Sequence, residues 1–426
     1  QGQARGGAPG GARGGRQRRR RPRAPGGSAP AVAAMGDLLS KPDTAKHVDN
    51  GAGASGRWPF GVSEMQGWRR GMEDAHLAMP DFDPSRQLGL FGVFDGHGGG
   101  AVARLAARRL PEVLRATPAF KEGRYRDALY DSFLILDRFI DSPEGRREVA
   151  ENVAASSFGG QGDGEEDDDE MIRRLVESGE VTEEQVQEYL ASQEEEEEEE
   201  EEDSDPDMQT EEGEEEAGAN SDWANGEGPD GMGATAVVAL VRGNEEVICA
   251  NAGDSRCLLA RGDRAVGLSR DHKPKNKAEL ARIKKAGGFV TSEGRVDGNL
   301  NLSRALGDFA YKKDPKLKQT EQKISCEAEM RTRALTAADR YLVLGCDGIF
   351  EKATNQDLVD FLLPRLQRLG GQTRRGRSAA KPLSSVCSAF LDHNIASNPA
   401  KEGGMGCDNM TLMVVDLRGT GPASAR

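Results

Sequence analysis

The 426-residue chain has no long apolar run, because no stretch approaches the ~18 consecutive apolar residues of a membrane-spanning helix. We therefore expect no membrane-spanning segment. The chain also has no Cys-x-x-Cys pair, and its six cysteines are dispersed. This pattern argues against a disulfide scaffold and a thiolate zinc site, and it suits a reducing compartment. Hydrophobic residues make up only 36% of the chain, which indicates a globular core diluted by other segments.

Charge is distributed unevenly behind a net value of −15. Residues 1–34 carry eight arginines and no acidic residue, whereas residues 163–216 carry 29 acidic residues against two arginines. Neither segment can bury enough apolar surface to offset the entropy of ordering the chain, so we predict that both are disordered. Between and around them we expect one folded domain that the acidic segment interrupts. The predicted divisions are a basic leader at 1–34, an N-terminal segment at 35–57, the folded domain at 58–156 and 231–418, the acidic disordered insertion at 157–230, and a disordered tail at 419–426.

The leader has two interpretations. It is either a basic arm for nuclear import or nucleic acid, or a stretch upstream of the true start at Met35. In the second case Met-Gly-x-x-x-Ser at the start fits an N-myristoylation signal on Gly36, although so short a motif is common by chance. A single myristoyl chain gives only marginal, reversible binding, so at most weak membrane association through myristoyl-Gly36 is expected.

Apolar periodicity predicts regular structure from near Trp58, with a gap between Ile140 and Gly231. Expected strands are 88–95, 234–241, 247–251, 257–261, 341–346 and 410–415. Expected helices are 98–116, 124–140, 276–286, 356–369 and 383–394. Because strands come in pairs and helices cluster elsewhere, the pattern favours a layered α+β sandwich over a βαβ alternation.

Carboxylates recur where expected strands end. Asp95, Asp347 and Asp408 each follow an apolar stretch and precede a turn-forming residue, and Asp254 is a similar case after a glycine. Singly these are ordinary turn residues, but several carboxylates converging on one edge would need a counter-ion. Such an all-oxygen site suits Mg²⁺ or Mn²⁺. Two such ions ~3.5–4 Å apart would activate a water for in-line attack on phosphorus.

A second segment supplies complementary groups. Arg69 offers a planar fork for phosphate oxygens, and Glu73 and Asp74 follow close behind it. His97 lies two residues after Asp95 and could protonate a leaving alkoxide. The alternatives are that Arg69 pairs with Asp74 structurally and that His97 only caps the following helix.

At these residues the sequence resembles the metal-dependent protein serine/threonine phosphatases of type 2C, over roughly 60–150 and 231–416. A long acidic insertion at this place, with Met-Gly near the start, resembles the gamma-type members in particular. The matching signatures occur in order at 66–69 with 72–76, 93–99, 233–236, 250–256, 271–274, 301–308, 346–349 and 406–411.

The resemblance implies a central antiparallel β-sandwich flanked by helices in four αββα layers, with a binuclear Mn²⁺ or Mg²⁺ centre at one end. It implies that Asp95 bridges both ions, that Gly96 is a backbone-carbonyl ligand, and that Asp347 and Asp408 are direct ligands. Glu73 would act mainly through bound water.

The same resemblance implies that Arg69 anchors the phosphate and that His97 is the general acid. It implies that Asp254, with Asp347, holds a weaker third ion. The implied reaction is hydrolysis of phosphoserine and phosphothreonine on proteins by direct attack of a metal-bridged water, without a phosphoenzyme.

The acidic insertion predicts partners. We expect it to recruit basic phosphorylated proteins, such as histones or Arg-rich splicing proteins, by long-range steering, and to repel nucleic acid. We expect a monomer with a nuclear or cytoplasmic location, or both. The alternatives are a non-catalytic acidic scaffold that binds basic proteins on a relict phosphatase fold, and a metal-dependent nuclease, which the acidic charge disfavours.

Overall fold

The computed structural model describes residues 38–54, 56–159, 228–372 and 382–418. The predictions for the leader at 1–34, for Gly36, for most of the insertion at 157–230 and for the tail at 419–426 lie outside these described residues. Within the described ranges, no helix is both long enough and apolar enough to cross a membrane.

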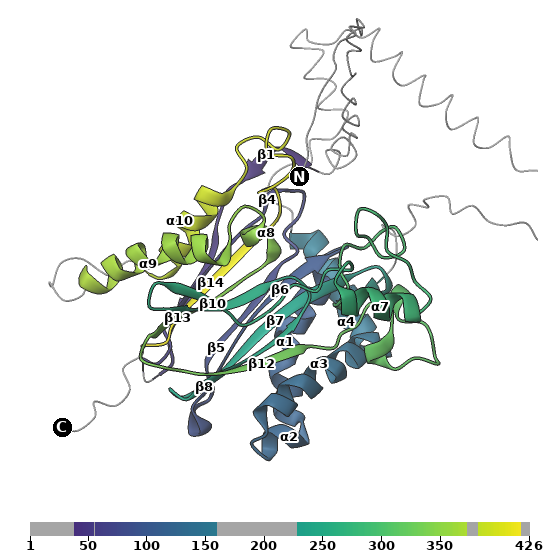
Figure 1. Ribbon diagram of the computed structural model, residues 1–426, viewed down its shortest axis with the longest axis horizontal. Coiled ribbons are helices and arrows are strands. Elements are labelled where there is room, and N and C mark those ends of the chain that lie inside the picture. The colour runs from purple at the N-terminus through teal and green to yellow at the C-terminus, as the bar shows by residue number, and fades with distance from the viewer. Residues whose placement is uncertain (1–37, 55, 160–227, 373–381, 419–426) are drawn as a thin grey trace, which may run out of the picture.

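Two antiparallel sheets form the centre of the molecule (Figure 1). The first has the strand order β10 (Arg264–Gly267), β9 (Arg256–Arg261), β13 (Asp339–Gly345), β14 (Met410–Asp416), β3 (Phe60–Met65) and β2 (His47–Gly51). The second has the order β12 (Glu329–Ala334), β8 (Glu246–Ala252), β7 (Gly233–Arg242), β6 (Leu88–His97) and β5 (Ala75–Asp83), with β11 (Leu306–Gly307) beside β7. A separate pair joins β1 (Leu38–Asp43) to β4 (Gly67–Arg69).

Side chains of β6 explain how the layers stack. Phe91 and Val93 point into the core between the two sheets, whereas Leu88, Leu90 and Phe94 point into the core on the opposite face. Strand β7 alternates in the same way, because successive side chains of a strand face opposite sides. Both faces of the second sheet are therefore buried, which accounts for the continuous apolar runs in its central strands.

Helices cover the outer face of each sheet (Figure 1). On the second sheet lie α1 (Ala101–Ala116) and α3 (Tyr125–Asp141), joined by α2 (Pro118–Lys121) and followed by α4 (Pro143–Gly159). On the first sheet lie α9 (Asn355–Gln372) and α10 (Ser384–Asn394), preceded by the short α8 (Asp347–Phe350). The predicted α+β class, with antiparallel sheets flanked by helices, is confirmed.

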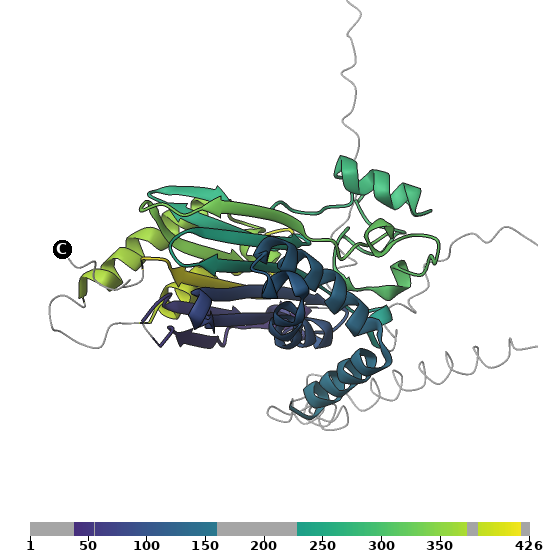
Figure 2. The ribbon, with the colours of Figure 1, turned by 90° about the horizontal axis from the view of Figure 1, so that it is seen from below.

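A small lobe, residues 274–325, has its own core and contains α7 (Lys277–Lys285). Ile283, Val296 and Ile324 are buried there, apart from the cores of the two sheets. Figure 2 shows α7 standing away from the sheets at one end of the sandwich. We call this region the α7 lobe.

Three expectations from the sequence are wrong. Among the described residues, regular structure is present from Leu38 rather than from near Trp58, because β1 and β2 are polar strands whose composition carries little strand signal. The expected gap after Ile140 is partly filled by α4, which begins at Pro143. Asp408 does not end a strand but precedes β14, so its turn leads into the sheet.

Candidate active site

All of the predicted site residues line one cavity of about 510 Å³ at the end of the sandwich. The sheet topology accounts for this convergence. Strands β6 and β8 both run antiparallel to β7, so their C-terminal ends lie at the same edge. The antiparallel pairing of β13 and β14 likewise places the end of one beside the start of the other. The residues gathered there are Arg69, Glu73, Asp95, Gly96, His97, Asp254, Asp347 and Asp408.

The centre of the cavity is a cluster of carboxylates. Asp95 has the same strand parity as Phe91 and Val93, so its side chain faces the space between the sheets. One oxygen atom each of Asp95, Asp254 and Asp347 lies within 4.8 Å of the others. The backbone nitrogen of Asp347 lies 3.5 Å from Asp95 Oδ2.

The electrostatics of this cluster favour a bound cation. Burial raises the pKa of Asp95 well above its ordinary value, and the like charges of neighbouring carboxylates, with Asp347 the largest, raise it further. Burial and Asp254 have the same effect on the pKa of Asp347. Asp254 Oδ1 is buried without a hydrogen-bond partner among the described residues. Buried, mutually repelling oxygen donors with spare lone pairs fit Mg²⁺ or Mn²⁺.

The segment that carries Glu73 is held in place by Asn409. The Asn409 side-chain amide donates to the carbonyls of Gln66 (2.8 Å) and Gly71 (2.9 Å), and its oxygen accepts from the Glu73 backbone N–H (2.9 Å). Gly96 allows that segment to approach closely, since a Cβ there would lie 2.4 Å from the Glu73 carbonyl oxygen. Gly96 and Glu73 both line the same cavity.

Arg69 lies at the mouth of the cavity. Its Nη2 donates to Asp408 Oδ2 at 2.8 Å, and its side chain is 49% exposed. The alternative in which Arg69 pairs with Asp74 does not hold, because Asp74 instead accepts a hydrogen bond from Thr411 Oγ1 at 2.7 Å. A guanidinium that is held on one side and open on the other can accept an anionic ligand.

His97 is oriented by a buried aspartate. Its Nε2 lies 2.9 Å from both carboxylate oxygens of Asp308, which is 2% exposed. Burial lowers the pKa of His97, but the carboxylates of Asp308, Glu73 and Asp254 together outweigh it, so the pKa lies above its ordinary value. The alternative role as a helix cap does not hold, because Gly100 caps α1 and no side chain bonds to the cap.

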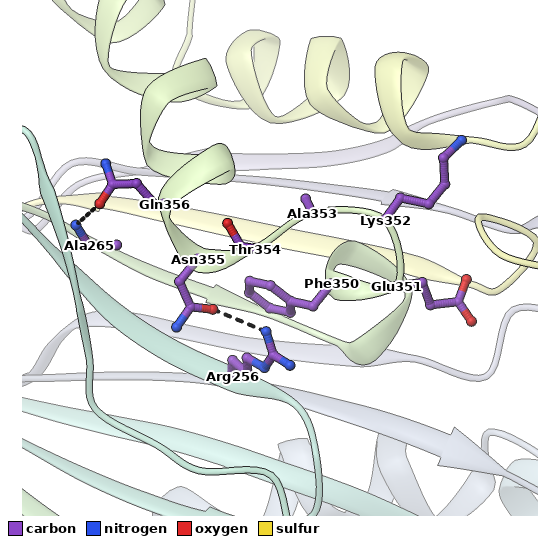
Figure 3. A pocket seen from close by; sticks show the side chains of 9 residues that line it. All are labelled: Arg256, Ala265, Phe350, Glu351, Lys352, Ala353, Thr354, Asn355 and Gln356. Atoms are coloured by element: carbon purple, nitrogen blue, oxygen red, sulfur yellow. Dashed lines mark hydrogen bonds between the residues drawn. The ribbon is translucent and has the colours of Figure 1, made fainter. Parts of the chain in front are cut away.

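A second cavity of about 560 Å³ lies beside α8 and the start of α9 (Figure 3). Its two cations are already paired. Arg256 forms a bidentate ion pair with Asp271 (2.8 Å for each contact), and Lys352 contacts Glu402 at 2.5 Å. The figure shows Arg256 lying under Phe350 and bonded to Asn355 (3.2 Å). This cavity contains none of the predicted site residues. Asp271, Asn355 and Phe350 hold the Arg256 side chain in place beside it.

Sequence reasoning gave no role to Asn409 or Asp308, although both lie within the signatures quoted above. Asn409 directly follows the candidate ligand Asp408, and Asp308 is the last residue of the signature 301–308. Neither residue therefore formed a sequence pattern of its own. The positioning role of Asn409 depends on three backbone groups of a segment more than 300 residues away, and that of Asp308 on a histidine 211 residues away. Only the fold shows these contacts.

Comparisons with known proteins agree with this geometry. The family model described as Protein phosphatase 2C matches residues 58–157 and 172–397. Probable protein phosphatase 2C 4 of Paramecium tetraurelia is 36% identical, over 90% of this chain and 100% of its own. Protein phosphatase 2C homolog 2 of Schizosaccharomyces pombe is 34% identical, over 89% of this chain and 78% of its own.

Solved structures share the fold. The crystal structure of a serine-threonine phosphatase 2C from Toxoplasma gondii has a TM-score of 0.54 at 16% identity, covering 87% of this chain and 99% of that one. A second phosphatase from Toxoplasma gondii has a TM-score of 0.55 at 21% identity and covers 87% and 95%. The chain therefore belongs to the protein phosphatase 2C family and is a protein serine/threonine phosphatase.

Proposed function

We propose that this chain hydrolyses phosphoserine and phosphothreonine on proteins, using two divalent cations, Mn²⁺ or Mg²⁺, at the carboxylate cavity. The observation that carries the proposal is the cluster of Asp95, Asp254 and Asp347, whose oxygens lie within 4.8 Å of one another in a cavity that also holds Arg69. A phosphate anchor beside a set of hard oxygen donors is what metal-assisted phosphoester hydrolysis requires.

The proposed ligands come from several elements. Asp95, Asp347, Asp408 and the Gly96 carbonyl would hold the two ions directly, Glu73 would act mainly through water, and Asp254 would hold a weaker third ion. When bound, such ions supply the positive charge that acidifies a water molecule and neutralises the phosphate. Asn409 keeps Glu73 within reach by bonding its backbone.

The other groups of the chain bind the substrate and move a proton. The open side of the Arg69 guanidinium binds phosphate oxygens, while Asp408 fixes its orientation. Because Asp308 occupies His97 Nε2, the other ring nitrogen, Nδ1, would be the one that serves the leaving group. A protonated His97 donates its Nδ1 proton to the serine or threonine oxygen and retains the Nε2 proton toward Asp308.

Metal removal tests this proposal. Dialysis against EDTA should abolish hydrolysis of a phosphoserine peptide, and adding Mn²⁺ or Mg²⁺ should restore it, because no side chain in the cavity replaces the ions. Release of inorganic phosphate measures the result, and Ca²⁺, a larger ion with a looser geometry, serves as the control cation. Full activity in EDTA would refute the metal mechanism.

We further propose that the acidic segment 163–216 recruits basic substrates. The described residues that follow this segment support the proposal, because Gly231 and Met232 lie against Gly98 and Asp308, next to the active site. The Met232 carbonyl accepts from the Asp308 N–H at 2.9 Å, and a Cβ on Gly98 would lie 2.3 Å from the Gly231 carbonyl oxygen. Residues 231–232, which follow the 29 acidic residues of 163–216 in the chain, therefore lie beside the active site. A negative charge concentrated there would steer cationic proteins toward the cavity.

Replacing 163–216 by a Gly/Ser segment of equal length tests the recruitment. At low salt, kcat/KM for a basic phosphoprotein should fall about 10- to 100-fold, because the electrostatic attraction is lost. Hydrolysis of p-nitrophenyl phosphate should stay unchanged, since this small ester needs no recruitment. An equal loss for both substrates, or no loss for either, would contradict the role. The monomeric state and the nuclear or cytoplasmic location stay predictions.

A further inference from the structure

Asp254 is paired with a cation of the chain itself. Its Oδ2 forms an ion pair with Lys273 Nζ, while its Oδ1 has no hydrogen-bond partner among the described residues. Asp254 is only 2% exposed, whereas the Lys273 side chain is 36% exposed. The ammonium group therefore approaches from the solvent side and covers one of two oxygens of a buried carboxylate.

The position of Lys273 is fixed by its neighbours in the chain. Residues 271–273 lie along residues 253–256, where the His272 N–H donates to the Gly253 carbonyl (3.0 Å) and the Gly253 N–H donates to His272 Nδ1 (3.2 Å). The bidentate pair of Arg256 with Asp271 holds the same two segments together, and Figure 3 shows Arg256 braced by Phe350 and Asn355. The backbone at Lys273 thus stays in place even when its side chain moves.

A buried carboxylate next to other carboxylates needs a compensating charge. Around Asp254, Lys273 is the cation in contact, and Asp95 and Asp347 are the neighbouring anions. We propose that Lys273 acts as a tethered counter-ion that competes with the weaker third divalent cation at Asp254, and so sets the concentration at which that ion binds. Lys273 then determines how tightly the third divalent cation binds, without being a metal ligand itself.

Two features of the geometry distinguish competition from a purely structural ion pair. The free Oδ1 gives a cation a first contact with Asp254 before the lysine leaves. The partly exposed side chain of Lys273 gives its ammonium group a path into water, so its displacement costs little packing. A structural pair would be expected to have both partners enclosed, as Lys312 and Asp137 are at 4% and 1% exposure.

The test is Mn²⁺ binding to the full chain by titration calorimetry, with Lys273→Met as the variant. Methionine keeps much of the length of the stem and removes the charge. The two tighter binding events should be unchanged, and the weakest event should tighten about tenfold or more, because a like charge leaves the site. Lys275→Met is the matched control, since Lys275 Nζ contacts the Ser292 carbonyl rather than a carboxylate.

Further variants keep the proposal falsifiable if Lys273→Met is unstable without metal. Lys273→Arg keeps the charge and should keep the weak binding. In an Asp254→Asn background the weak event should be absent, and adding Lys273→Met should change neither Mn²⁺ affinity nor the rise in Tm that Mn²⁺ produces. Equal third-ion affinity in the parent chain and Lys273→Met would overturn the proposal, as would tightening that persists in the Asp254→Asn background.

The inference rests on the proposed metal chemistry, but the two can fail separately. Binding is measured without substrate, so a tightened third ion in a chain without phosphatase activity would refute only the proposed function. Metal-dependent phosphatase activity with no response to Lys273→Met in Mn²⁺ binding would refute only the role of Lys273.

Discussion

Replacing Asp95 by asparagine should lower phosphatase activity by about 10³-fold or more and should also make the metal-free protein more stable. The loss of activity follows from the central position of this carboxylate, which lies within 4.8 Å of the ligand oxygens of Asp254 and Asp347. Without its charge the ions bind weakly and the attacking water is no longer acidified.

The gain in stability follows from linkage. The pKa of Asp95 is raised in the folded state by burial and by neighbouring carboxylates, so the folded protein binds its proton more tightly than the unfolded chain does. Such a group contributes its full stability below its unfolded pKa and loses it as pH rises through its folded pKa. The metal-free protein should therefore lose stability as pH rises from acidic toward neutral. Asparagine carries no charge and removes this cost.

The measurements are phosphopeptide hydrolysis with Mn²⁺ and urea unfolding in EDTA at pH 5 and pH 8. The difference in stability between the parent and Asp95→Asn should be larger at pH 8. Asp263→Asn, at an exposed position outside the cavity, is the control and should change neither quantity. Lower stability of metal-free Asp95→Asn at both pH values would contradict the electrostatic account of the cluster.

Replacing Lys312 by methionine should destabilise the protein by about 3–5 kcal/mol and also reduce kcat. Lys312 Nζ lies 2.7 Å from Asp137 Oδ1, and both side chains are almost fully enclosed. Asp137 also accepts from the Gly307 N–H (3.0 Å) and from Gln319 Nε2 (2.9 Å). Removing the lysine leaves a buried carboxylate without its counter-charge, which is among the most costly single changes.

The expected effect on kcat arises because Gly307, which Asp137 holds, is adjacent in the chain to Asp308. Gly307 is bonded to Asp137 and precedes Asp308, which orients His97. A displaced Asp137 would therefore shift Asp308 and with it His97, the proposed general acid, although Asp137 itself lies outside the active-site cavity.

Urea unfolding and phosphopeptide kinetics measure both effects of the Lys312 change. Lys313→Met, one residue further and exposed, is the matched control and should change stability by less than about 0.5 kcal/mol. Adding Asp137→Asn to Lys312→Met should recover part of the loss, because the amide oxygen can still accept from Gly307. A Lys312→Met protein as stable as the parent would show that the pair is not needed.

Most central strands and most long helices could be predicted from the sequence, but the edge strands, the internal strand β3 and helix α4 could not. In β6 and β7 both faces are buried, so the sequence is a continuous apolar run. In β3 every residue is buried as well, but Gly61, Ser63 and Glu64 interrupt the apolar pattern. Ser63 is hydrogen-bonded to Ser388 and Glu64 to His76, so these partners satisfy the polar side chains in the fold. In the sequence the same side chains obscure the pattern of a buried strand.

The carboxylates of the site could be predicted because several aspartates beside turn residues at strand ends form an unusual pattern. Their exact surroundings could not, since they depend on chain segments that are far apart. The ion pair of Lys312 with Asp137 spans 175 residues, and that of Lys273 with Asp254 depends on how residues 271–273 lie along the turn after β8. Neither pairing leaves a periodic signal in the sequence.

The pairing of β6 with β7 has a consequence for how the enzyme could be divided. These strands lie on either side of the acidic insertion in sequence, yet they pair from Leu88 with Arg242 to His97 with Gly233. Asp95 and His97 precede the insertion, whereas Asp347 and Asp408 follow it. A chain cut within the insertion would give two fragments that share one ladder and one active site, and neither fragment alone would carry the full ligand set. Catalysis would then report reassembly of the two fragments.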